Sequence, residues 1–128
     1  MAEAAIEAPE ADEAVTEDMV RALVDLFYTR AHADPLLGPF FAATIPDWPE
    51  HLEVVGAFWS RVLRGTDGYR GCVMGAHGRL RMTAAHFDRW MALFEDSARQ
   101  TLPPEGFDRA MTVARSLDER LRLFAARR

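Results

Sequence analysis

The sequence predicts an all-α domain. In four long stretches the apolar residues recur every three or four positions, which is the spacing of one face of a helix. Three of these stretches follow residues that favour helix starts, namely Thr16, Asp47 and Thr83. No stretch of any length alternates apolar and polar residues in the manner of a strand, and no segment repeats.

The first long helix is expected to begin after Thr16, with Glu17 and Asp18 near its positively charged end. Asp34 should end this helix, because the residue before a proline is pushed out of the helical region. Residues 36–45 then predict a short helix or a tight turn that carries aromatic side chains. The apolar face of the long helix contains Val20, Leu23, Val24, Phe27, Tyr28 and Ala31.

A second long helix is predicted from Asp47 to about Leu63. Asp47 followed by Glu50 matches a capping box, and Pro49 occupies the first turn, where its missing N–H costs nothing. Gly65 should stop the helix. Five of the eight glycines fall between positions 65 and 81, so no long regular structure is expected there. One face of the helix carries His51, Val55, Phe58 and Val62.

Two further helices complete the predicted fold. Thr83 caps the first of them, and Pro103-Pro104 separates it from the second. The inward face of the first contains Phe87, Trp90, Met91, Phe94 and Ala98. The inward face of the second contains Phe107, Met111, Ala114, Leu117, Leu121 and Phe124.

Length and composition indicate a single soluble, cytoplasmic domain of 128 residues. Residues 1–15 are rich in Ala, Glu and Asp and are expected to form a disordered acidic tail before a domain over 16–128. The net charge of −5 argues against nucleic-acid binding. The lack of a secretion signal or a long apolar run argues against export and membrane insertion, and the lone Cys72 suits a reducing compartment.

Common enzyme signatures are missing from the sequence. It contains no P-loop, dinucleotide-binding glycine pattern, nucleophile elbow, metalloprotease His-Glu pair or Cys-x-x-Cys-His haem-attachment pattern. Four histidines and many aromatic residues on helix faces remain. Taken singly, His51 and His86 are more often exposed first-turn residues, and Tyr28 is more often a core tyrosine bonded to a backbone carbonyl.

From about Val15 to the carboxyl terminus, short motifs follow one another in a particular order. These are Phe27-Tyr28, Asp34-Pro35-Leu36-Leu37-Gly38-Pro39-Phe40-Phe41, Asp47-Trp48-Pro49-Glu50-His51-Leu52, Phe58-Trp59, Gly65, Tyr69-Arg70-Gly71, Met74-Gly75-Ala76-His77 and the run from His86 to Phe94. In order, residue type and spacing, the set resembles the third group of truncated haemoglobins, a globin family of protozoan and bacterial type. No single motif is diagnostic, but the ordered set is specific.

The resemblance implies a shortened globin fold, a two-over-two helical sandwich around a non-covalent haem b. His77 matches the proximal histidine that binds the iron, and His86 is the second choice for that role. Tyr28, His51 and Trp90 match the distal residues that face a gas ligand, with Phe27 beside them. Around the haem the resemblance and the inward faces also place Phe41, Val55, Phe58, Met74 and Phe94. Tyr69, Arg79 and Arg81 are candidates for binding the haem propionates, because they lie near His77 in the sequence.

The chemistry of these residue types agrees with the resemblance. A porphyrin needs apolar walls, and its iron needs a neutral imidazole fixed by a hydrogen bond from the other ring nitrogen. Oxygen bound at a ferrous haem carries partial negative charge, so the Tyr28 hydroxyl and the Trp90 indole N–H can stabilise it. His51 can add a third donor, or it can swing outward and gate the pocket.

Three functions remain open at this point. The first is a haem protein that binds oxygen, nitric oxide or carbon monoxide at a polar distal pocket. The second is redox catalysis on the same haem, either nitric-oxide dioxygenation or peroxide-dependent turnover. It needs a partner reductase, because the sequence carries no flavin or nicotinamide domain. The third is a haem-free helical interaction module in which the aromatic residues only form a core.

Overall fold

The computed structural model describes residues 15–45, 47–69 and 82–126, which form five helices. They are α2 (Glu17–Ala33), α3 (Leu37–Thr44), α4 (Trp48–Arg64), α6 (Ala84–Thr101) and α7 (Pro104–Ala126). No strand occurs within these described ranges, and the predicted all-α class is confirmed. Residues 1–14 of the predicted tail and the glycine-rich segment 70–81 lie outside the described residues.

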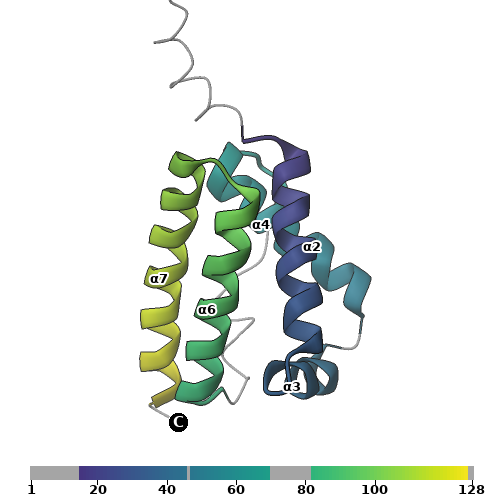
Figure 1. Ribbon diagram of the computed structural model, residues 1–128, viewed down its shortest axis with the longest axis vertical. Coiled ribbons are helices and arrows are strands. Elements are labelled where there is room, and N and C mark those ends of the chain that lie inside the picture. Colours follow the sequence, from purple (N-terminus) through teal and green to yellow (C-terminus); the bar gives the residue numbers. More distant parts are fainter. Residues whose placement is uncertain (1–14, 46, 70–81, 127–128) are drawn as a thin grey trace, which may run out of the picture.

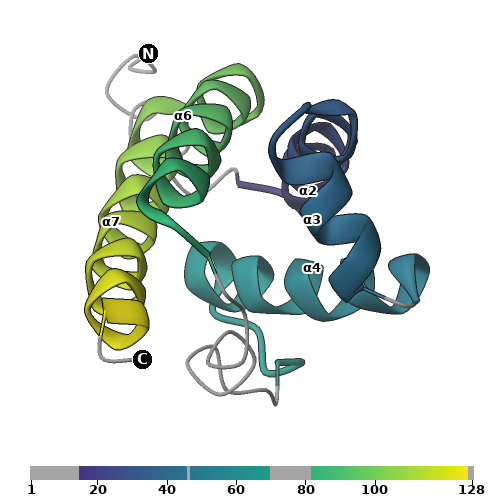
Figure 2. The ribbon, with the colours of Figure 1, turned by 90° about the horizontal axis from the view of Figure 1, so that it is seen from below.

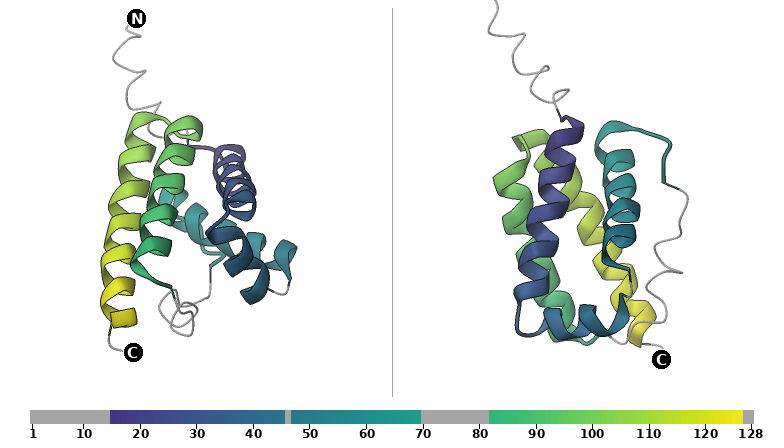
Figure 3. Two further views of the ribbon diagram at one scale, coloured as in Figure 1. Left: turned by 60° about the horizontal axis from the view of Figure 1, so that its bottom comes forward. Right: turned by 90° about the vertical axis from the view of Figure 1, so that its right-hand side faces the viewer.

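The four long helices, α2, α4, α6 and α7, pack against one another (Figures 1 and 2). The consecutive helices α6 and α7 run antiparallel side by side, and α2 packs against α6 on the side away from α7. Helix α4 contacts both α2 and α7. The short α3 runs across the end of α2 (Figure 3). The packing agrees with the two-over-two helical sandwich expected from the resemblance.

The predicted helix starts are confirmed by their capping hydrogen bonds. The Thr16 hydroxyl accepts from the N–H of Met19 at 3.1 Å, and Asp47 accepts from the N–H of Glu50 at 3.0 Å. Gly65, with φ of 75°, ends α4 in the left-handed conformation that favours glycine. These caps supply partners for helix-end N–H groups that would otherwise have none within the helix.

His86 has a structural position that the sequence did not suggest. The Thr83 hydroxyl accepts from the His86 N–H, and the His86 Nδ1 accepts from the Thr83 N–H at 3.0 Å, so the two residues form a reciprocal capping box at the start of α6. The His86 ring also lies 4.8 Å from the ring of Phe40. The side chain that was second choice for the iron is therefore bound to its own helix end.

Asp34 joins three helices at one buried carboxylate, which is 8% exposed. Its Oδ2 accepts from the backbone N–H groups of Leu36 and Leu37, both at 2.9 Å, where α3 begins. Its Oδ1 accepts from Arg89 of α6 at 2.8 Å. Gly38 completes the joint, because a β-carbon there would lie 2.3 Å from the carbonyl oxygen of His32. The chain can therefore turn sharply from α2 into α3.

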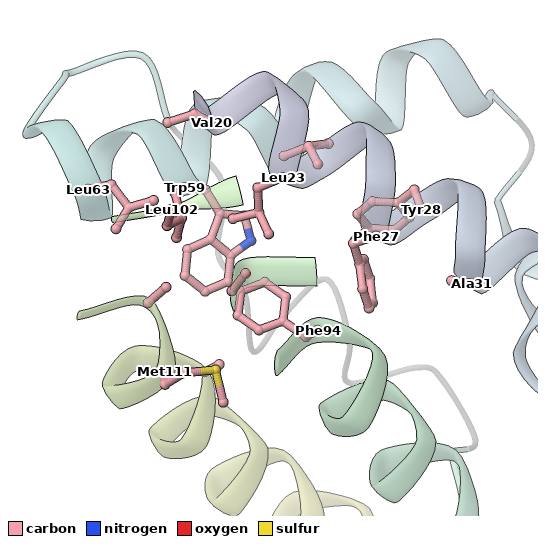
Figure 4. Close-up of a cluster of buried hydrophobic side chains, with 14 of the residues drawn as sticks. Val20, Leu23, Phe27, Tyr28, Ala31, Trp59, Leu63, Phe94, Leu102 and Met111 are labelled. Atoms are coloured by element: carbon pink, nitrogen blue, oxygen red, sulfur yellow. The ribbon is translucent and has the colours of Figure 1, made fainter. Parts of the chain in front are cut away.

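The core centres on Phe94 of α6, which is 1% exposed (Figure 4). Its ring stacks on Trp59 of α4 at 4.8 Å and on Trp90 at 5.1 Å, and it meets Phe27 of α2 edge-on at 5.7 Å. Such aromatic pairs add about 0.5–1.5 kcal/mol each beyond the area they bury. The stack therefore locks α2, α4 and α6 together.

Two sequence-based placements need correction. Val15, placed in the tail, is 6% exposed, and its carbonyl accepts from Arg64 at 3.3 Å, so it belongs to the core. Phe124, placed on the inward face of the last helix, is 39% exposed. Periodicity continued the apolar face along α7 to its end, but a face is buried only where another helix covers it.

The contribution of the Asp34 joint to stability should depend on pH, because the pKa of the Asp34 carboxyl is shifted in the folded protein. Burial alone would raise the pKa of this carboxyl, but the hydrogen bonds from Leu37 and Leu36 and the Arg89 guanidinium outweigh burial and lower it. The folded-state pKa thus lies below the unfolded value of about 3.9. The stabilisation that ionised Asp34 gives to the folded protein is complete at pH values above its unfolded-state pKa. It is lost as the pH falls through its folded-state pKa.

We expect Asp34→Ala to reduce the free energy of unfolding at neutral pH by about 2–3 kcal/mol, because two backbone N–H groups and a guanidinium lose a buried charged acceptor. The difference from wild type should shrink in acid. Asp96→Ala is the matched control, since Asp96 pairs with Arg30 at an exposed site and should cost less than about 1 kcal/mol. Urea unfolding measures both values, and equal losses would contradict the buried role of Asp34.

Candidate functional site

A cavity of about 230 Å³ opens among all five described helices. Most of its walls are aliphatic or aromatic, with a few polar groups among them. This combination is usual for sites that take an apolar ligand and orient it by a small number of polar contacts. The lining residues are Tyr28, Phe41, Thr44, Ile45, His51, Val54, Val55, Phe58, Trp59, Tyr69, Met82, Phe87, Trp90, Leu117, Asp118 and Leu121.

The three predicted distal residues lie on this cavity and come from three helices, α2, α4 and α6. The rings of Tyr28 and His51 meet edge-on, with centroids 5.2 Å apart. Trp48 stacks on the outer side of the pair, 6.0 Å from His51 with an interplanar angle of 22°, and lies 5.7 Å from Tyr28. His51 is therefore held between the indole of Trp48, at the start of its own helix α4, and the phenol of Tyr28 from α2.

The Tyr28 side chain is a buried hydrogen-bond donor. The residue is 8% exposed, and its burial raises the pKa of the phenol above its ordinary value. A phenol is protonated at neutral pH in any case, and burial further favours this neutral form, so the hydroxyl can donate a hydrogen bond. In surroundings of low polarity such a bond is electrostatically stronger than the same bond in water.

Trp90 is supported from behind by the aromatic stack of the core. Its ring lies nearly parallel to Phe94, with an interplanar angle of 6°, and meets Phe27 edge-on at 5.2 Å. Phe27 and Phe94, which we predicted to contact the haem or its ligand, do not line the cavity. They lie one layer behind it and support the residues that do.

The other predicted haem contacts divide into two groups. Phe41, Val55, Phe58 and Tyr69 line the cavity, and the rings of Phe58 and Tyr69 meet edge-on at 5.2 Å. The second group lies outside the described residues and comprises the predicted iron ligand and its neighbours, His77, Met74, Arg79 and Arg81.

Several lining residues were not predicted as site residues. Phe87, Leu117 and Leu121 were predicted to face inward, and Trp59 was noted only in a motif, but neither helical spacing nor a motif distinguishes a core contact from a cavity wall. The sequence carries no comparable signal for the remaining unpredicted residues. They are Thr44, Ile45, Val54, Met82 and Asp118.

The cavity fits a bound haem in the character of its walls, most of which are apolar. Oδ1 of Asp118 is buried and has no hydrogen-bond partner among the residues that the structure describes. In the same part of the chain, no group of three or more His, Cys, Asp or Glu side chains is arranged to hold a metal ion.

None of the helices in residues 15–45, 47–69 and 82–126 combines the length and apolarity needed to cross a membrane.

Comparison with known proteins places these features in a family. No protein-family model matches the chain. The group 3 truncated haemoglobin ctb of Campylobacter jejuni is 31% identical over 90 residues, which cover 66% of this chain and 71% of that protein. The crystal structure of the group III truncated haemoglobin from Campylobacter jejuni superposes with a TM-score of 0.80 at 25% identity, covering 88% of this chain and 93% of that one. The fold is that of a haem globin, and the chain belongs to the group 3 truncated haemoglobins.

Proposed function

We propose that this protein binds a haem b in the cavity and holds a diatomic gas there through hydrogen bonds from a polar distal side. The observation that carries the proposal is the meeting of Tyr28, His51 and Trp90 on a cavity with otherwise mostly apolar walls. Three helices contribute these residues, although 62 positions separate Tyr28 from Trp90 in the sequence. Membership of a family of haem globins supports the same conclusion.

The haem would supply the iron at which oxygen, nitric oxide or carbon monoxide binds. The protein supplies the surroundings. Phe41, Val55 and Phe58 present apolar surface that can cover a porphyrin and exclude water. His77 is proposed as the iron ligand, on its match to the family's proximal position. Tyr69, Arg79 and Arg81 are proposed to bind the propionates.

Tyr28 is the strongest candidate for the donor to the gas ligand. Its hydroxyl is protonated at neutral pH, and its ring is fixed by Phe27 at 4.8 Å and by His51 at 5.2 Å. A donor that is held in place loses little conformational entropy when the ligand arrives. Trp90 is fixed in the same way by its stacking on Phe94.

Several donors on one side of the cavity should hold oxygen tightly. Oxygen at a ferrous haem carries partial negative charge, and each donor directed at it slows its release. Slow release suits sensing or chemistry on the bound gas better than bulk transport, in which the gas must leave readily. We therefore propose ligand retention, rather than delivery, as the role of the distal residues.

Haem uptake is the first expected result. The purified protein, supplied with haemin, should show a strong haem absorption band that shifts on reduction and again on addition of carbon monoxide. His77→Ala should lose or alter the band, whereas His86→Ala should keep it, because the His86 ring is bound at the start of α6.

Each alternative result of that experiment is informative. A wild-type protein that takes up no haem would contradict the proposal and leave the aromatic residues as a core alone. Loss of the band in His86→Ala with an unchanged band in His77→Ala would refute the assignment of the iron ligand while leaving haem binding intact.

Tyr28→Phe should accelerate oxygen dissociation by about 10- to 100-fold, because a hydrogen bond to a charged group contributes about 1.5–3 kcal/mol and each 1.4 kcal/mol is a factor of ten. Thr44→Val is the control, because it removes a hydroxyl from another wall of the cavity that already donates to the carbonyl of Phe40. Stopped-flow displacement of oxygen measures both rates. An unchanged rate in Tyr28→Phe would show that the phenol is not the donor.

A further inference from the structure

The capping box at the start of α6 is closed by a ring nitrogen, whereas the side chain of a glutamate or glutamine usually closes such a box. Nδ1 of His86 accepts from the backbone N–H of Thr83 at 3.0 Å, and the Thr83 hydroxyl accepts from the N–H of His86 at 3.3 Å. The side-chain oxygen of a glutamate or glutamine would accept this bond throughout the neutral pH range. An imidazole accepts it only while Nδ1 carries no hydrogen.

A second proton on the His86 ring removes the acceptor. Both ring nitrogens of an imidazolium are donors, so Nδ1 can no longer accept from the Thr83 N–H. The Thr83 hydroxyl, 2.9 Å from Nδ1, can accept the new hydrogen, but the Thr83 N–H then loses its partner in the box. The charged ring also lies in the first turn of a helix, where the helix dipole disfavours positive charge. Histidine is the side chain that ordinarily changes charge between about pH 5 and 8.

The described groups around the ring do not supply another acceptor for the Thr83 N–H. From α3 the ring contacts Phe40, 4.8 Å away, where α3 and the start of α6 lie at the same end of the molecule (Figure 1). Helix α3 contains no ionisable side chain. The charged residues in the same part of α6 are Asp88 and Arg89, which are paired with Arg122 of α7 and with the buried Asp34. The Phe40 ring can attract a charged imidazole, so the effect of protonation falls on the capping box and not on the ring's position.

The capping box lies between two residues of the cavity wall. Met82 directly precedes Thr83, Phe87 directly follows His86, and both Met82 and Phe87 line the cavity. The N–H of Phe87 also donates to the carbonyl of Thr83 at 3.1 Å. The hydrogen bonds that fix the first turn of α6 therefore also fix one edge of the cavity.

We propose that this capping box is a pH-dependent switch. Neutral His86 holds Met82 and Phe87 in the cavity wall, and protonated His86 loosens the first turn of α6 and with it this edge of the wall. A looser wall admits water to an apolar ligand and so weakens its retention. The switch itself belongs to the polypeptide chain, whereas its effect on a bound haem rests on the proposed function.

The test compares wild type with His86→Gln, because glutamine at the third helical position can close the same box and does not titrate. NMR measures hydrogen exchange at the Thr83 amide at about pH 7.5 and about pH 5.5, each relative to an unstructured peptide at that pH. The protection of this amide should fall by about fivefold in acid in wild type, the size expected for the loss of a helix cap. In His86→Gln the protection should stay constant.

His32→Gln is the matched control, since it removes another histidine, in the last turn of α2. It should keep the wild-type fall in protection at the Thr83 amide. The inference is overturned if the protection falls equally in wild type and His86→Gln, or if His32→Gln abolishes the fall.

Haem release tests whether the switch acts on the cavity. The haem-loaded proteins are mixed with an excess of a haem-scavenging protein, and the absorbance change gives the release rate. Acid should accelerate release from wild type about fivefold more than from His86→Gln, since other effects of acid act on both proteins alike. Equal acceleration would refute the connection between the capping box and the cavity wall. A wild-type protein that binds no haem would instead contradict the proposed function, and the exchange measurement would still decide whether the switch exists.

Discussion

The arrangement of the whole domain depends on the aromatic stack around Phe94. Its ring lies between Trp59 of α4 and Trp90 of α6, and Phe27 of α2 meets it edge-on. Trp59 and Trp90 contribute both to the buried core and to the cavity wall, so the stack lies between the core and the cavity. A change in the core is therefore transmitted directly to the residues that would face a ligand. The stack allows a small helical domain to keep an open cavity without losing its shape.

The Asp34 joint closes the same cavity at its α3 side. By capping the start of α3 and binding Arg89 of α6, the carboxylate fixes the direction in which α3 leaves α2. This direction brings Phe41 and Thr44 to the cavity wall. Burying a charge for this purpose is tolerated because the carboxylate has three donors, so its desolvation is offset. The Asp34 joint thus helps to determine where Phe41 and Thr44 lie on the cavity wall, although Asp34 itself does not line the cavity.

Most of the fold could be predicted because helix formation leaves local signals. Thr16, Asp47, Thr83 and Gly65 mark helix ends through hydrogen bonds or backbone conformation within a few residues. The site could be predicted only in part. Periodicity shows that Phe94 faces inward, but whether an inward residue contacts the core or the cavity depends on helices far away in the sequence. Thr44 gives no local signal as a site residue, since its place on the cavity wall depends on how α3 packs against the other helices.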